Sequence, residues 1–452
     1  MGLQTTLLNS SNALNVFEQE FSTIQNNIAN ANTPGYAAQN VTLVADSFFP
    51  SEGLYGGLST GPLANTRSEY LEQTVRAQTT LLGSAQQQAS DLAPLQTLFD
   101  LSSTTGVSGS LNSFFNSFSA LSVNPNDAVA RQNVITQAQA AAISFNQAAT
   151  GINSVSSNVQ LGTNSSVSTI NQIAADLAFI NQRTASTPGG GQDAGLSARI
   201  NTDLENLSQV ANFTVLHTDG QVNVYLGGQT PIVLNQQSYS IATDFSTPQT
   251  ILRDSQGNDI TSQITGGQLG AQIQESNVIL PGYKGSLNTL AQTFADTVNN
   301  ALAQGVDQNG NPPVNSLFTY NAGSNAALTL GVTPGFTTSQ IAAALATAPG
   351  GNGNALAIAQ LANAPTVSTF TFTQAFGNLG QQVGADILSA KNNQTEQQSL
   401  VTQAQTQRAA VSGVSYNTEA AKLLEFQQAF TAVSKVVTTL NAVTTALMNM
   451  VP

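Results

Sequence analysis

The N-terminal stretch GLQTTLLNSSNALNVFEQEFSTIQNNI, residues 2–28, carries two interleaved sets of apolar side chains, each repeating every seven residues. A heptad repeat is typical of a helix that buries one stripe against another helix. One polar residue, Ser10, interrupts the stripe. We call this stripe the N-terminal seam, and it consists of Leu3, Leu7, Leu14, Phe17, Phe21, Ile24 and Ile28.

The C-terminal stretch, residues 419–450, repeats this pattern with a single polar interruption, Thr444. Its seam consists of Leu423, Phe426, Phe430, Val433, Val437, Leu440 and Leu447. The simplest partner for each amphipathic helix is the other terminus. The sequence therefore predicts a terminal unit made of residues 1–36 plus 411–452.

The C-terminal helix is apolar beyond its seam, because Val436, Val443 and Met450 form a neighbouring stripe. One partner helix cannot cover both stripes. The positions beside the seams hold Gln, Ser, Asn and Ala rather than the Glu and Lys pairs that support zipper helices. We therefore expect both ends to be loose in the monomer and to order against neighbouring subunits.

Helical periodicity accounts for most of the remaining chain. Residues 37–66, which are rich in Gly, Ser and Pro, are expected to be irregular extended structure instead. The helical patterns cover residues 67–99, 111–121, 141–180, 196–207, 284–303 and 376–408. Within the longest of them, residues 162–166 predict an interruption, and residues 187–191 predict a Gly-rich loop.

The hydrophobic period changes to two within residues 211–265. Residues 213–217 and 222–226, separated by Asp219-Gly220, indicate a β-hairpin. Further short apolar runs occur at 232–234, 251–253 and 260–264. These runs predict a small β-rich insert.

These patterns predict a mainly α fold with a small β insert in an elongated, multi-domain chain. The paired terminal helices would form one end, and residues 37–210 plus 266–410 would form a helical rod-like domain. The β-rich domain, residues 211–265, would lie at the far end. A chain that runs out and returns brings its two termini together.

The composition excludes several classes of function. The formal net charge is −13 and the chain has 11 Lys and Arg residues, too few basic groups for a nucleic-acid partner. There is no apolar run of membrane-spanning length, so no membrane insertion is expected. No Lys or Arg precedes Arg67, so the basic n-region of a secretory signal peptide is missing.

The residue content of the sequence gives little support for catalysis or for cofactor binding. The single histidine, His217, lies at the end of a predicted strand and is best explained as a solvated neighbour of the turn. With one His and no Cys, the chain can build neither a typical zinc site nor a Ser-His-Asp triad. We therefore expect no enzyme activity, no metal and no cofactor.

One segment at the end of the N-terminal seam is highly specific to a single protein superfamily. Residues 27–36, NIANANTPGY, resemble the N-terminal signature of bacterial flagellar rod, hook and hook-associated proteins. Residues 412–414 and 419–430 resemble the C-terminal counterpart. The motif residues are Asn27, Asn30, Asn32, Thr33, Pro34, Gly35 and Tyr36.

The interior of the chain resembles one branch of that superfamily, the hook-associated protein 1 (FlgK) family. The resemblance lies in residues 114–118, 124–132, 219–224, 305–318 and 354–357, and it spans nearly the whole chain. The β insert is short for that family. The outermost domain of larger relatives is therefore expected to be missing.

The resemblance implies a structural adaptor at the junction between the flagellar hook and filament. Its subunits would form a ring of identical copies through the terminal helices, with hook protein and the second junction protein as neighbours. The chain would be extracellular, after export with a chaperone through the flagellar type III channel and without a cleaved signal peptide.

Two alternatives remain open from the sequence. The nearer one is a hook or distal-rod protein of the same superfamily, which is expected to lack the long helical block at 67–183. The more remote one is a secreted coiled-coil adhesin or effector.

Overall fold

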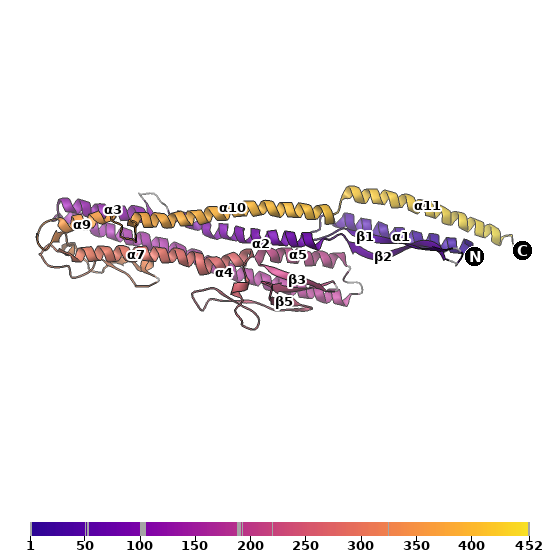
Figure 1. Cartoon of the computed structure of the whole chain (residues 1–452), viewed down its shortest axis with the longest axis horizontal. Helices are drawn as coiled ribbons and strands as arrows, with labels where there is room; N and C mark the ends of the chain where they lie inside the picture. The colour runs from indigo at the N-terminus through magenta and orange to yellow at the C-terminus, as the bar shows by residue number, and fades with distance from the viewer. Residues whose placement is uncertain are drawn as a thin grey trace.

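The computed structural model describes residues 2–49, 51, 54–99, 105–187, 191, 193–218, 220–323 and 325–450. The molecule is elongated, and both termini lie at the same end (Figure 1). Helices make up 66% of the chain, and the sheets are small. The mainly α, elongated fold that the sequence predicts is therefore confirmed. Residues 188–190 of the predicted Gly-rich loop, and Asp219 of the predicted hairpin turn, lie outside the described residues.

An antiparallel pair of helices and an antiparallel β-hairpin form the end of the molecule that holds both termini. Helices α1 (Gly2–Asn30) and α11 (Tyr416–Met448) lie side by side. A long hairpin of β1 (Gln39–Phe49) and β2 (Leu54–Asn65) packs against α1. We call α1, α11 and this hairpin the terminal unit.

The regularity of this hairpin differs from the prediction of irregular structure at 37–66. Its register runs from Gln39 opposite Asn65 to Phe49 opposite Leu54, with one shift between Val41 and Leu43. Pro62 lies opposite that shift, where a missing N–H interrupts a ladder least. The Gly and Pro content therefore marks a local irregularity in a strand and not the absence of strands.

The helical body consists of long, nearly parallel helices (Figure 1). They are α2 (Glu69–Leu92) with the 3-10 turn η2 (Ala93–Thr97), α3 (Gly106–Val123), α4 (Ala128–Ser186), α5 (Ala194–Val210), α6 (Gly267–Gln274), the π turn η5 (Glu275–Ile279), α7 (Leu280–Ala303) and α10 (Phe372–Ser412). Two apolar cores run through this body. The first surrounds α3, α7 and the start of α10, and the second joins the C-terminal half of α4 to α5 and the β insert.

Helix α4 continues without a break through residues 162–166, so the predicted interruption is wrong. The small residues serve close packing there. A Cβ on Gly162 would lie 2.8 Å from the Nε2 atom of Gln272, and Ser166 Oγ donates a hydrogen bond to Gln272 Oε1 at 3.0 Å. The lack of side-chain bulk thus admits α6 to the surface of α4.

The β insert contains a four-stranded antiparallel sheet in the order β3-β4-β5-β6. Its strands are β3 (Phe213–Thr218), β4 (Gln221–Leu226), β5 (Thr230–Leu234) and β6 (Gln237–Ser238), and a separate pair joins β7 (Ala242–Asp244) to β8 (Ile251–Arg253). The predicted hairpin strands are confirmed. The predicted strand at 260–264 is wrong, because a 3-10 turn, η4 (Thr261–Gln263), occupies that segment.

The position of the insert also differs from the prediction, because it does not form the far end of the molecule (Figure 1). Val222, Val224 and Ile232 on its inner face join the core around Ile170 and Leu177 of α4. The insert therefore lies along the side of the body, because the apolar face of its sheet needs a helix surface to cover it.

Short elements fill the end of the body away from the termini. They are β9 (Gly305–Val306), β10 (Phe318–Thr319), α8 (Ala326–Thr329), β11 (Gly331–Val332), η6 (Thr338–Gln340), β12 (Ala344–Leu345), α9 (Gly353–Gln360) and η7 (Leu361–Asn363). Figure 1 shows α9 beside α3 at this end. Across the described residues, no helix has the length and apolar character that crossing a membrane requires.

Candidate assembly interface

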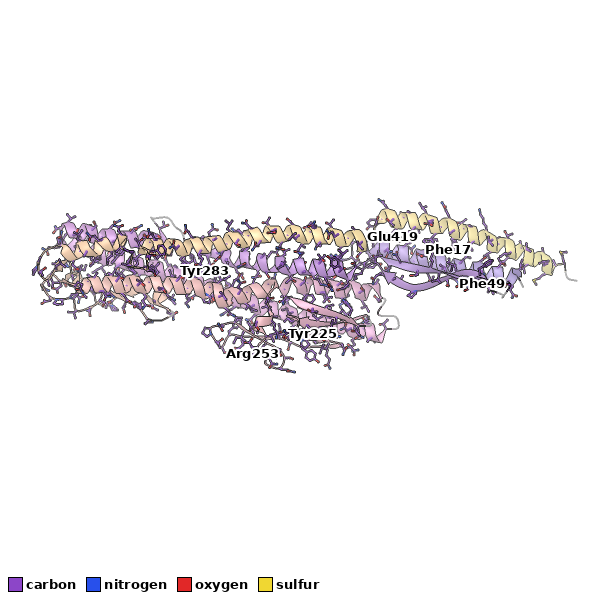
Figure 2. All side chains as sticks on the ribbon, viewed as in Figure 1. Phe17, Phe49, Tyr225, Arg253, Tyr283 and Glu419 are labelled. Atoms are coloured by element: carbon purple, nitrogen blue, oxygen red, sulfur yellow. The ribbon has the colours of Figure 1, made fainter. Side chains whose placement is uncertain are left out.

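Aromatic contacts join the two terminal helices. The ring centroids of Phe17 and Phe426 are 6.0 Å apart, and those of Phe21 and Phe430 are 5.9 Å apart. Both distances lie in the range in which tilted aromatic pairs attract each other. Two members of each predicted seam therefore meet across the helix pair, and Figure 2 shows Phe17 between α1 and α11.

Burial along the two seams is uneven. In α1, Phe17 and Ile24 are buried, and Leu7, Leu14, Phe21 and Ile28 are half-buried. In α11, Leu423, Phe426, Phe430, Val433, Val437 and Leu440 are half-buried. The seam residues nearest the tip of the unit, Leu3 and Leu447, are exposed. Helix α11, all of whose residues the structure describes, has one buried residue, the polar Glu419.

The outer surface of the terminal unit exposes several large apolar side chains. Val436, Val443 and Met450, the second stripe that the sequence indicates, are all exposed. On the hairpin, Phe48 is 68% exposed, and Phe49 lies near the tip of the unit (Figure 2). Apolar side chains gathered in this way are typical of a surface that another molecule covers.

The residue Asn27 organises the base of the terminal unit, and its side chain uses its full hydrogen-bonding capacity. Its Oδ1 accepts bonds of 2.8 Å from the Tyr36 hydroxyl and from the Gln39 backbone N–H. Its Nδ2 donates to the Gln39 carbonyl at 2.8 Å and to Glu419 Oε2 at 3.1 Å. Asn27 thus links α1, the start of β1 and the start of α11 in one network.

Other motif residues shape the turn that follows α1. The Thr33 hydroxyl donates to Asn30 Oδ1 at 3.1 Å, and Asn32 Nδ2 donates to the Tyr416 hydroxyl at 3.3 Å. After Pro34, Gly35 has a φ of +70°. A Cβ there would lie 2.3 Å from the Ala198 carbonyl oxygen, so only glycine allows the turn to approach α5 this closely.

An ion cluster connects this turn to three body helices. The side chain of Glu72 on α2 is 4% exposed and pairs with Arg67 at 2.6 Å and with Arg408 of α10 at 3.2 Å. Arg408 also pairs with Glu205 of α5 at 2.8 Å, and Arg67 donates to the Gly35 carbonyl at 2.6 Å. Since buried charges are costly without partners, this cluster fixes the relative position of these helices.

Backbone bonds complete the connection between the body and the terminal unit. The Ala38 N–H donates to the carbonyl oxygen of Ser412, the last residue of α10, at 2.9 Å, and Thr66 N–H donates to the Ala38 carbonyl at 2.9 Å. On the other side, Lys422 Nζ donates to Asn40 Oδ1 at 3.0 Å and pairs with Glu419 at 3.3 Å. We call the Asn27 network, the Gly35 turn and the Glu72 cluster together the joint.

The sequence identified the seam and motif residues but not the charged part of the joint. Arg67, Glu72, Glu205 and Arg408 are distant in the chain, and no motif connects them. One signal was available. In a chain with 8% charged residues, a basic and an acidic residue only five positions apart, such as Arg67 and Glu72, indicate a candidate buried pair.

His217 lies beside the joint, in a groove that Arg67 also lines, but takes no part in its hydrogen bonds or ion pairs. Its Nε2 atom is 3.5 Å from Glu69 Oε2, and both side chains are more than 40% exposed. This placement agrees with the prediction of a solvated residue near a turn. Within the described residues, no cluster of three or more His, Cys, Asp or Glu side chains could hold a metal ion.

Comparison with known proteins gives two family matches. The model of the flagellar hook-associated protein FlgK helical domain matches residues 92–318, and that of the flagella basal body rod protein matches residues 7–36. The second match covers most of α1 and the motif of the joint. The chain is thus one of the structural proteins of the bacterial flagellum. It belongs to the FlgK family of flagellar hook-associated proteins, and it is not an enzyme.

Individual relatives agree with this assignment. The chain is 24% identical to flagellar hook-associated protein 1 of Bacillus subtilis over 97% of this chain and 96% of that protein. It is 26% identical to flagellar hook-associated protein 1 of Salmonella typhimurium, over 73% of this chain and 63% of that longer protein. The structure of the flagellar hook junction protein FlgK from Burkholderia pseudomallei has the same fold, with a TM-score of 0.70, 17% identity, and coverage of 75% of this chain and all of that one.

Proposed function

We propose that this chain is a structural adaptor between the flagellar hook and filament, and that it assembles as a ring of identical subunits. The relatives are named as hook-associated and hook-junction proteins. The observation that carries the proposal is the burial of α11, where every apolar seam residue remains half-buried or exposed. A helix with this surface gains its remaining burial from other subunits.

We propose the two seams as the assembly surface, with hook protein and the second junction protein as axial neighbours. In this proposal the body and the β insert form an outer layer around the terminal units. The division into residues 1–36 plus 411–452, residues 37–210 plus 266–410, and residues 211–265 is part of the proposal. The terminal helices α1 and α11, both described in full, contribute no residue to either apolar core of the body, which supports the terminal part of this division.

Export without a cleaved signal and with the help of a chaperone also belongs to the proposal. Helix α1 pairs with α11, so a cleavage that removed α1 would remove half of the paired seams. An export chaperone would cover the apolar stripe that the monomer leaves open. The position of the protein at the junction would then be extracellular.

Limited proteolysis of the purified monomer, followed by mass spectrometry, tests the proposal. We expect rapid removal of about the first 30 and the last 40 residues and a resistant middle, because loosely packed ends are cleaved first. Deleting residues 424–452 should abolish incorporation into flagella and motility while the body retains its helical circular dichroism. Ends that are protected from protease and from hydrogen exchange in the monomer would contradict assembly-coupled ordering.

The nearer alternative, a hook or distal-rod protein, is less favoured, because the rod-protein model matches only residues 7–36. Helices α2, α3 and α4 form the long helical block that such proteins are expected to lack, and the FlgK helical-domain model covers α3 and α4.

A further inference from the structure

The chain contains two Asn-Gly pairs, Asn309-Gly310 and Asn352-Gly353. An asparagine followed by glycine can react with its own backbone, because glycine has no Cβ to hinder the approach of its nitrogen to the side-chain amide carbon. Both asparagines are exposed. Exposure therefore does not distinguish the two pairs, and the difference between them lies in what holds each side chain.

The first pair lies in a turn directly after β9, at the end of the body away from the termini. The Asp307 N–H donates to the Asn311 carbonyl oxygen at 2.8 Å. Asp307 Oδ1 accepts bonds from the Asn309 N–H at 2.8 Å and from the Asn311 N–H at 2.9 Å. These bonds hold the backbone of the turn. Within the described part of the chain, no hydrogen bond holds the Asn309 side-chain amide.

Gly310 is open to solvent in the same turn. Its φ is +78°, and no described atom beyond its chain neighbours lies within 4 Å of the place that a Cβ would occupy. Residues 308–312 are all exposed, and the Gly310 N–H donates to the Asp307 carbonyl oxygen at 3.1 Å. Opening this one bond exposes the Gly310 nitrogen to the Asn309 side chain and displaces no packed side chain.

Asn352 of the second pair is held through both its side chain and its backbone. Its Nδ2 donates to the carbonyl oxygen of Ser122, near the end of α3, at 2.6 Å. Asn352 is also the N-cap residue of α9, and its carbonyl oxygen accepts the Leu356 N–H at 3.0 Å. A Cβ on Gly353 would lie 2.8 Å from the Leu345 side chain. Reaction at this pair therefore requires breaking the Ser122 bond and disturbing the packed first turn of α9.

We propose that Asn309 is a modification site at which the chain deamidates without an enzyme. The Gly310 nitrogen gives its proton to hydroxide and attacks the Asn309 Cγ atom. The new N–C bond closes a five-membered imide, and the side-chain nitrogen takes a proton from water and leaves as ammonia. Water then opens the imide at one of its two carbonyl groups. The product is aspartate or, where the backbone now passes through the side-chain carbon, isoaspartate.

The modified turn differs from the original in its charge and in its backbone. Either product carries a carboxylate at neutral pH, so the chain gains one negative charge beyond its formal −13. Isoaspartate also lengthens the backbone of the turn by one carbon atom. The Gln308 N–H donates to the Ser339 carbonyl oxygen of η6 at 3.4 Å, and the neighbouring Thr338 carbonyl oxygen accepts a 2.8 Å bond from Arg131 of α4. The modification therefore occurs beside a contact between η6 and α4.

The reaction is irreversible in the isolated protein, because the ammonia is lost to the solvent. The modified fraction at position 309 therefore increases with the age of each molecule, while Asn352 retains its amide. The site thus distinguishes old molecules from newly made ones by charge.

Incubation of the folded, full-length chain at pH 8, followed by peptide mass spectrometry, tests the proposal. Asn309 should deamidate at least about tenfold faster than Asn352, because a hydrogen bond and a helix turn must open at the second pair. Equal rates in the folded chain, or an Asn309 that keeps its amide, would overturn the proposal. In urea the two pairs should react at similar rates. A difference that persists in urea would overturn the structural explanation.

Asn311 is an internal control within the same turn. It is also exposed, but Pro312 follows it, and the proline nitrogen has no proton to lose. Asn311 should therefore keep its amide while Asn309 loses it. Equal deamidation of the two would show direct hydrolysis by water and would contradict the imide route.

Two matched variants connect the reaction to the charge of the chain. Isoelectric focusing of wild type should show a more acidic species that accumulates during incubation. Asn309→Gln should form this species much more slowly, because the longer side chain closes a less favourable six-membered ring. Asn352→Gln, with its fold checked by helical circular dichroism, should form it at the wild-type rate. Wild-type accumulation in Asn309→Gln would overturn the assignment to Asn309.

Discussion

The helical body and the terminal unit bury their apolar side chains to very different extents. In the body, Phe294 is 0% exposed, and its ring lies 5.0 Å from that of Phe318 and 5.2 Å from that of Phe114. In the terminal unit, Phe426 and Phe430 are only half-buried, although both contact an aromatic ring of α1. The same residue type therefore completes a core in one region and leaves a surface open in the other.

The difference has a geometric origin. Each body helix is surrounded by several others, so its apolar face is covered within one chain. Helix α11 extends beyond the body and contacts chiefly α1 (Figure 1). A pair of helices covers one narrow stripe on each partner, so the neighbouring stripe stays exposed.

The largest expected effect separates the two regions directly. Phe294→Ala should destabilise the monomer by about 3–5 kcal/mol, because it opens a cavity in a dense aromatic cluster. Phe426→Ala should lower the free energy of unfolding of the monomer by only about 1 kcal/mol, because its ring is half-buried. The same variant should nevertheless block incorporation into flagella. Urea unfolding and a motility assay measure the two outcomes. Equal monomer destabilisation by both variants would remove the distinction between core and open surface.

A smaller effect tests the connection between the regions. Glu72→Gln removes the charge that Arg67 and Arg408 share and should cost about 2–4 kcal/mol, below the range for fully buried pairs because Arg408 is partly exposed. Hydrogen exchange should increase first in the segment 35–40 and in the last turn of α10. The control Glu425→Gln changes an exposed carboxylate on α11 and should leave both segments unchanged.

The boundary between the regions also has a pH dependence. Asp203 on α5 lines an open groove of about 420 Å³ beside Asn30, Pro34 and Tyr36. Burial, and then the negative charge of Asp176, raise the pKa of Asp203 to about 6, and Arg199 partly opposes them.

The folded state therefore favours protonated Asp203, and this contribution is full below pH 3.8 and is lost as the pH rises through about 6. Asp203→Asn should stabilise the chain at pH 7 by roughly 1–2 kcal/mol, after allowance for solvent screening, and have no such effect at pH 3. Thermal unfolding at the two pH values measures this. A stabilisation that is equal at both would exclude titration as its cause.

The smallest expected effect on monomer stability concerns the second apolar stripe, which consists of Val436, Val443 and Met450. Val443→Ser should change monomer stability by no more than about 0.5 kcal/mol, because the side chain is exposed. The variant should nevertheless reduce incorporation into flagella, since the same side chain is covered in the proposed assembly. Thr445→Ser, a nearby exposed polar position, is the control. Wild-type incorporation of Val443→Ser would show that this stripe is not an assembly surface.

Much of this architecture could be predicted from the pattern of apolar residues. The seven-residue repeat predicted that Phe17 and Phe21 would face a C-terminal helix, and their contacts with Phe426 and Phe430 agree with this. Predictions from local patterns were wrong where small residues serve the packing of one helix against another. Gly162 admits Gln272 to the surface of α4 and does not break the helix.

The charged joint and the position of the insert could not be predicted for a different reason. Glu72 and Arg408 are 336 residues apart, and nothing in the local sequence of either indicates the other. The insert is identifiable from its period of two, but its covering surface on α4 depends on how the helices pack. Both features are properties of the folded chain and have no local signature.

The hydrogen bond between Asn27 and Glu419 spans 392 residues of chain. During translation, α1 and the β1–β2 hairpin that packs on it emerge long before α11 exists, so the stripe of α1 that faces α11 stays uncovered until synthesis is almost finished. Closing so large a loop is also entropically costly. The body can complete its local contacts earlier, which makes the helix pair the last part of the molecule to form. Until α11 is made, then, the nascent chain carries an amphipathic helix with one apolar face uncovered, which another protein can bind.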